Sequence, residues 1–140
     1  MIGSNPAQRD IRSNRDGLMA KLDIHQFPCL KDNYGVLIRD SAAGVTAAID
    51  APEADAVERA LAETGWRLTH ILTTHHHGDH TAGNVPLKAR HGCTIIGPKG
   101  EAAKVPGIDR AVGEGDTVAF GGFTIRVLET PGHTAGHISY

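Results

Sequence analysis

The chain has 140 residues, a length that suits one domain and is too short for two. Its 40% hydrophobic and 21% charged residues are typical of a globular protein. A formal net charge of −2 and an aromatic content of 4% argue against a nucleic acid partner. No apolar run reaches the roughly 20 residues that a membrane-spanning helix needs, so we expect no membrane partner.

The first 18 residues are polar and lack the apolar core of a secretory signal. Their arginines suggest a transit peptide, but two aspartates break the acid-poor pattern of such peptides. We therefore expect a disordered extension over 1–18, a folded part over 19–140 and a cytoplasmic location. Cys29 and Cys93 form no CxxC unit, and in a reducing compartment we expect them to be small buried apolar residues.

Alternation of apolar and polar residues predicts the first strands of the fold, at 22–27, 34–40 and 45–50. The last two are joined by a short hairpin connection, SAAG. Pro52 suits the first turn of a helix and Gly65 is a natural stop, so a helix is expected between them. The order strand, helix, strand indicates a crossover onto one sheet.

Four further segments are expected after this crossover. A β-rich run at 67–74 predicts a buried strand, a helix should cover much of 81–91, and a short strand follows at 94–97. The Gly- and Pro-rich stretch 98–115 is predicted to be mostly loop. A β-hairpin turning at its two adjacent glycines is expected over 117–130.

The string THHHGDHTAGN directly follows the predicted buried strand, where open α/β sheets place their ligands. Side chains of an extended segment alternate, so His75, His77 and Asp79 should face one way and His76 the other. A turn into the next helix brings His80 beside Asp79. One segment thus offers two histidines to one metal and an Asp–His pair to a second. The alternative, a histidine-rich surface loop, fits the buried-strand context poorly.

The string ETPGHTAGH offers a second loop with candidate ligands. His133 can complete a three-histidine site, whereas His137 is expected to be a packed or hydrogen-bonded residue. Asp50 ends a strand at the same sheet edge, where it either caps a helix or orients a ligand histidine. Imidazole and carboxylate ligands without thiolate suit zinc, iron or manganese.

The pattern H-x-H-x-D-H resembles the signature of the metallo-β-lactamase superfamily, and the flanking strings resemble its glyoxalase II branch. These strings are HQFPCLKDNYGVLI, AAIDAP, LTTHHHGDHTAGN and ETPGHTAGHISY. The resemblance implies an α/β fold, the αββα sandwich of that superfamily, incomplete at the C-terminus. Residues 19–140 would form the N-terminal part of its catalytic domain.

The resemblance also implies a ligand set for two divalent metal ions, with zinc preferred and iron or manganese as alternatives. The first ion is assigned to His75, His77 and His133, and the second to Asp79 and His80. Asp79 is further expected to position the nucleophilic hydroxide. A bridging aspartate, a last histidine and the glutathione-binding residues of the family lie beyond the position of Tyr140. We therefore expect either a fragment or a chain that has lost part of its site.

The implied function is hydrolysis of a small-molecule glutathione thioester, S-D-lactoylglutathione, to D-lactate and glutathione. Two alternatives stay open. One is another superfamily enzyme, such as a glutathione-persulfide dioxygenase with one iron, and the other is a truncated, inactive metal-binding module. We expect very low thioesterase activity from the isolated chain, and self-association through an unpaired sheet edge.

Overall fold

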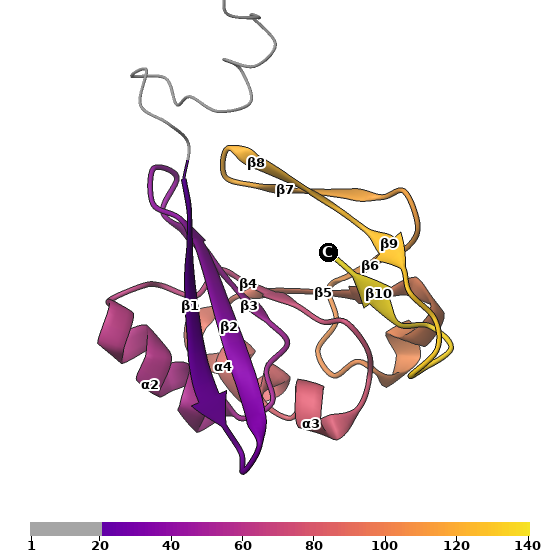
Figure 1. Cartoon of the computed structure of the whole chain (residues 1–140), viewed down its shortest axis with the longest axis horizontal. Coiled ribbons are helices and arrows are strands. Elements are labelled where there is room, and N and C mark those ends of the chain that lie inside the picture. Colours follow the sequence, from indigo (N-terminus) through magenta and orange to yellow (C-terminus); the bar gives the residue numbers. More distant parts are fainter. Residues whose placement is uncertain (1–20) are drawn as a thin grey trace, which may run out of the picture.

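The computed structural model describes residues 21–140, so the extension expected over 1–18 lies outside the described residues. Six strands form one sheet in the order β1-β2-β3-β4-β5-β6 (Figure 1). Strands β1 to β3 pair antiparallel, and β3 to β6 pair parallel. The strands are β1 (Leu22–Cys29), β2 (Asn33–Asp40), β3 (Val45–Ile49), β4 (His70–Leu72), β5 (Thr94–Pro98) and β6 (Arg110–Val112).

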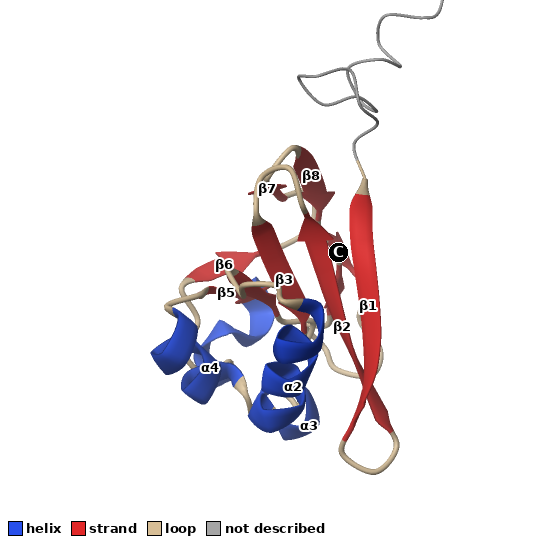
Figure 2. Cartoon of the chain, turned by 90° about the vertical axis from the view of Figure 1, so that its left-hand side faces the viewer, coloured by secondary structure: helices blue, strands red, loops and turns tan. Residues whose placement is uncertain are grey.

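Helices cover one face of this sheet (Figure 2). They are α2 (Ala54–Thr64), α3 (Gly78–Thr81) and α4 (Asn84–His91), followed in the chain by the 3₁₀ helix η1 (Lys99–Lys104). Helix α2 is the predicted crossover from β3 to β4. It buries Val57 and Leu61 against the sheet and ends at Gly65, whose φ of 71° is a left-handed conformation that glycine adopts without strain.

The other face of the sheet packs against two smaller β-units. The hairpin β7 (Thr117–Phe120) and β8 (Phe123–Arg126) turns at Gly121 and Gly122, as predicted, and β9 (Leu128–Glu129) pairs with β10 (Ile138–Ser139). The buried carboxylate of Asp40 anchors the hairpin, because it accepts a hydrogen bond from the Gly122 N–H at 2.8 Å. A sheet with helices on one side and strands on the other confirms the predicted α/β class.

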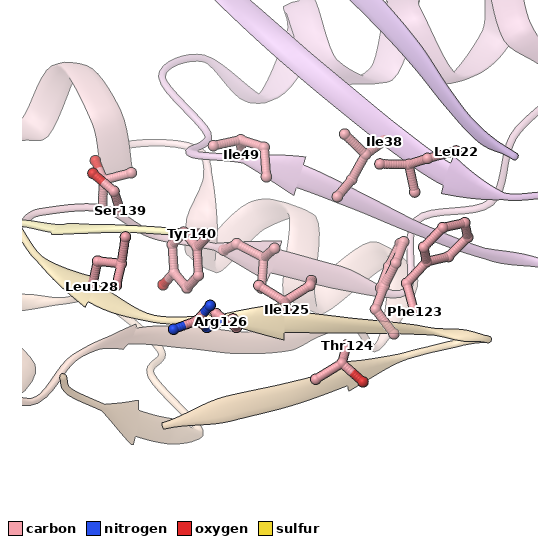
Figure 3. Close-up of a pocket in the computed structure, with 13 residues that line it drawn as sticks. Leu22, Ile38, Ile49, Phe123, Thr124, Ile125, Arg126, Leu128, Ser139 and Tyr140 are labelled. Atoms are coloured by element: carbon pink, nitrogen blue, oxygen red, sulfur yellow. The ribbon is translucent and has the colours of Figure 1, made fainter. Parts of the chain in front are cut away.

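A cavity of about 730 Å³ separates the β7–β8 hairpin from the main sheet. Figure 3 shows Leu22, Ile38 and Ile49 pointing into it from the sheet, opposite Phe123 and Ile125 of the hairpin strand. Its wall is mostly apolar and contains no histidine among the described residues. The cavity therefore belongs to the packing between the two β-layers. The predicted histidine ligands lie outside it.

Two details of the predicted elements were wrong. Strand β4 covers only His70–Leu72, because the N–H of Thr74 leaves the ladder and donates to the Asp50 carboxylate at 2.7 Å. Helix α4 covers much of 81–91, as expected, but it begins only after Gly83, which packs so closely on Ala51 that a Cβ would lie 2.9 Å from the Ala51 carbonyl oxygen.

The stretch 98–115, predicted to be mostly loop, contains η1 and the short strand β6. Strand β6 has three residues, too few to show a periodicity in sequence. Helix η1 is stabilised by hydrogen bonds that Glu101 accepts from His76 and Gly136, which lie in distant segments of the chain. Among residues 21–140, no helix combines the length and the apolar character needed to cross a bilayer.

Candidate metal centre

The histidines of the two predicted loops meet at the carboxyl end of the parallel strands. We call His75, His77 and His133 the triad; one ring nitrogen from each lies within 4.8 Å of the others. The Nδ1 of His77 is 3.1 Å from the Nε2 of His133. The rings of His75 and His133 are 5.0 Å apart, centroid to centroid. The structure therefore brings together the three histidines that the sequence assigned to one ion.

His75 is the buried member of the triad, with 2% of its surface exposed. Its Nδ1 is 2.8 Å from the Thr74 hydroxyl, which itself donates to Asp50, so Nδ1 carries the proton and Nε2 the lone pair. That Nε2 is buried and has no hydrogen-bond partner in the described part of the chain. Burial, followed by the proximity of His80, lowers the pKa of His75 to about 4, so its imidazole is neutral near pH 7.

A buried, neutral nitrogen lone pair without a partner is costly unless something occupies the space before it. A divalent cation between the three nitrogens would satisfy it, and the donor set of three imidazoles suits zinc, iron or manganese. The residues present therefore fit a metal ion.

His80 and Asp79, which we call the pair, lie next to the triad at helix α3. The His80 Nε2 is 3.6 Å from an Asp79 carboxylate oxygen, and the His80 ring is 4.2 Å from that of His75. A hydrogen bond to Asp50 raises the pKa of His80 against the opposing effect of burial. The pair is more open than the triad, since the Asp79 side chain is 55% exposed.

Asp50 connects the triad with the pair. One carboxylate oxygen accepts from the Thr74 N–H at 2.7 Å, and the other accepts from the Thr74 hydroxyl at 2.8 Å and from His80 Nδ1 at 2.9 Å. Although Asp50 also lies close enough to His75 and His80 to form a metal group with them, these donors already occupy its oxygens. The N-cap of helix α2 is Glu53, so the capping role considered for Asp50 was wrong. Asp50 instead fixes the tautomers of His75 and His80.

His76 and His137 are engaged in other contacts. The His76 Nδ1 is hydrogen-bonded to Glu101 at 2.5 Å, and the His137 Nδ1 lies 2.9 Å from the Thr130 hydroxyl. The His137 ring stacks on His75 at 4.8 Å between centroids. Packing and hydrogen bonding are the roles that the sequence indicated for His137.

Glu101 is a site residue that sequence reasoning missed. It sits on η1, is 7% exposed, and contacts both histidine loops. Burial alone would raise its pKa, but the neighbouring Thr134 hydroxyl and hydrogen bonds from His76 and Gly136 outweigh it and lower the pKa to about 2. No motif or spacing marks this glutamate, because its partners lie 25 and 35 residues away.

Cys29 and Cys93 are both free, buried and part of the apolar core beneath the helices, as predicted. Burial raises the pKa of each thiol, so neither is a ready thiolate at neutral pH.

Comparison with known proteins identifies the family of the chain. Residues 35–140 match the metallo-beta-lactamase superfamily, and the chain belongs to that superfamily. It is 60% identical over 122 residues to a hydroxyacylglutathione hydrolase of Rhizobium meliloti, covering 87% of this chain and 48% of the relative. It is 55% identical over 125 residues to a protein of the same name from Brucella anthropi, covering 89% of this chain and 48% of that protein. The resemblance to the glyoxalase II branch is thereby confirmed, and the chain spans about half the length of the curated relatives it matches.

Solved structures confirm the fold. The crystal structure of ETHE1 from Myxococcus xanthus superimposes with a TM-score of 0.71 at 34% identity, covering 83% of this chain and 52% of that chain. The B3 metallo-beta-lactamase BLEG-1 gives a TM-score of 0.74 at 19% identity, covering 84% of this chain and 66% of that chain, and indicates the fold alone.

Proposed function

We propose that this chain carries the metal centre of a thioester hydrolase of the glyoxalase II type, with S-D-lactoylglutathione as substrate. The observation that carries the proposal is the partnerless Nε2 of His75, buried beside two further imidazoles. The similarity to hydroxyacylglutathione hydrolases, 55% to 60% identical, supports the reaction class.

The triad would hold a first divalent ion and the pair a second, with zinc as the preferred metal. Such ions supply Lewis-acid activation of water and polarise the carbonyl under attack. The protein contributes orientation: Thr74 and Asp50 keep the Nε2 lone pairs of His75 and His80 available. We assign to Asp79 the role of positioning the attacking water, because its carboxylate lies beside His80.

In the proposed reaction, water adds to the thioester carbonyl and the carbon–sulfur bond breaks. The thiolate of glutathione leaves with the electron pair of that bond, and D-lactate is the other product. Of the two protons of the water, one passes to the thiolate and the other to the solvent. A thiolate is a good leaving group, so the reaction does not depend on a strong general acid.

The test is turnover by the purified chain loaded with zinc, monitored as loss of the thioester of S-D-lactoylglutathione. We expect a low rate that disappears on chelation and in His77→Ala. The matched control is His91→Ala, because His91 binds Glu58 and belongs to neither metal group. Iron-dependent oxygen uptake with glutathione persulfide, without thioester loss, would instead support the dioxygenase. Metal binding with neither reaction would support the metal-binding module.

We also propose a cytoplasmic location, which the two free cysteines favour. Copies of the chain are further proposed to associate through strand β1. In the described part of the sheet β1 pairs with β2 alone, and Ile24 on this edge strand is 69% exposed. Analytical ultracentrifugation should show a concentration-dependent dimer that Ile24→Lys weakens. A monomer at all concentrations would contradict this proposal.

A further inference from the structure

We propose that Glu101 is a positioning residue that holds the two ligand loops, residues 74–81 and 131–137, at the spacing the triad needs to bind a metal ion. This inference rests on the proposed metal centre and adds to it a residue outside the motif.

The two oxygens of Glu101 serve different loops. Its Oε1 accepts from the backbone N–H of His76 at 3.0 Å and from the His76 ring, and its Oε2 accepts from the Gly136 N–H at 2.8 Å. His76 lies between the ligands His75 and His77. Gly136 lies three residues after His133, in the same loop. One carboxylate therefore contacts both loops that carry the triad.

The approach of the second loop to Glu101 is close enough to require glycine. A Cβ on Gly136 would lie 2.7 Å from the Glu101 Cγ and 2.8 Å from its Oε2. The loops have one further backbone bond between them near the site, from the Ile138 N–H to the Thr74 carbonyl at 3.0 Å. Without the glutamate, the position of His133 relative to His75 would depend on this bond, on the stacking of His137 against His75 and on the metal itself.

Glu101 is assigned a positioning role because its oxygens are already occupied by hydrogen-bond donors. It appears in neither group of side chains close enough to share an ion. Its contribution should therefore appear as preorganisation: residues that orient metal ligands typically change metal affinity by about 10- to 100-fold when replaced.

The experiment measures binding of Co²⁺ to the metal-free 140-residue chain by visible absorption, with thermal unfolding of the metal-free protein recorded in parallel. The test variant is Glu101→Gln, which keeps the size of the side chain but places an amide group against N–H donors. We expect its Kd for the first Co²⁺ to rise about 10- to 100-fold, with an altered absorption band.

The matched control is Asp40→Asn. Asp40 is also a buried carboxylate that joins distant segments, but it anchors the β7–β8 hairpin and contacts no part of either ligand loop. This variant should lower the unfolding temperature and leave the Co²⁺ affinity and spectrum unchanged. A purely structural role for Glu101 would make the two variants behave alike.

Gly136→Ala gives a second test at the opposite side of the contact, and it applies if Glu101→Gln fails to fold. The added methyl group should separate the loop from Glu101 and weaken Co²⁺ binding in the same direction. A wild-type Kd and spectrum in either folded variant would overturn the role of Glu101. A wild-type chain that binds no Co²⁺ would instead contradict the metal centre itself.

Discussion

The triad and the pair lie side by side, but they are built differently. The triad takes its nitrogens from two loops separated by more than fifty residues, and its central imidazole, His75, is buried. The pair takes both of its groups from adjacent residues of one short helix, with Asp79 largely exposed. The triad is thus fixed by tertiary structure, whereas the pair is fixed locally and by one carboxylate, that of Asp50.

This difference indicates unequal metal affinities within residues 21–140. The triad presents three imidazoles already close together, one of which has a buried nitrogen without a hydrogen-bond partner, and this is a nearly complete ligand set for one ion. An exposed carboxylate and one imidazole provide fewer ligands, and solvent competes for them. We therefore expect the triad to fill first and the pair to bind the second ion more weakly.

The largest effect should come from removing a triad ligand that the fold does not need. His133 is exposed, so His133→Ala should fold normally. Its loss should weaken the first site by more than the roughly 100-fold that replacement of an orienting residue costs. Calorimetric zinc titration gives the measurement, with His91→Ala as control. A first-site affinity equal to that of the wild type would remove His133 from the ligand set.

A smaller effect, larger at the pair than at the triad, is expected from Asp50→Asn, because Asp50 bonds His80 directly and reaches His75 only through Thr74. Asp50 has a φ of 61°, a conformation that asparagine also tolerates, so the backbone should not be strained. The amide has one oxygen and cannot accept from the Thr74 N–H, the Thr74 hydroxyl and His80 together as the carboxylate does, so the second ion should bind about 10- to 100-fold more weakly. Asp109→Asn, which alters a carboxylate that is bonded to Ile95 and Lys88 and belongs to neither group of candidate ligands, is the matched control. Equal weakening of both ions would show that the triad depends on Asp50 as much as the pair does.

The smallest effect concerns the metal-free protein and its dependence on pH. Burial, and then His80, lowers the pKa of His75 from 6.5 to about 4. Between these pH values His75 is protonated in the unfolded chain and neutral in the folded chain. The unfolding free energy should therefore fall as pH is lowered from about 6.5 to about 4. His80, whose pKa is raised, contributes stability in the opposite direction, which is lost as pH rises through its folded pKa.

Urea unfolding of metal-free wild type and His75→Gln across this interval separates the two contributions. The variant should lose the fall in stability toward low pH that His75 causes and keep the opposite contribution of His80. Parallel pH profiles for the two proteins would show that His75 titrates as it does in the unfolded chain.

The sequence supports predictions mainly for the local part of this comparison. Strand alternation and the H-x-H-x-D-H spacing identify His75, His77, Asp79 and His80, because these residues are neighbours in the chain. His133 could be added because its own loop carries a second glycine-rich pattern. The β7–β8 hairpin was predictable for the same reason, since its turn lies between two short alternating strands.

The long-range half was not predictable. Glu101 reaches partners in two other loops, and the choice for Asp50 between capping and orienting depended on where Thr74 and His80 lie in space. Strand β6 and helix η1 were not predicted, because short elements that depend on tertiary contacts show no periodicity in the sequence. The contacts between loops that orient the ligands could not be predicted from the sequence, because they join residues far apart in the chain.

The most direct test of unequal sites is a titration of the metal-free chain with Co²⁺ beyond two equivalents, followed by visible absorption. The expected result is a first equivalent bound tightly through imidazoles, sensitive to His133→Ala, and a weaker second equivalent sensitive to Asp50→Asn. Two equivalents of equal affinity, or a first equivalent that His133→Ala leaves intact, would contradict this account.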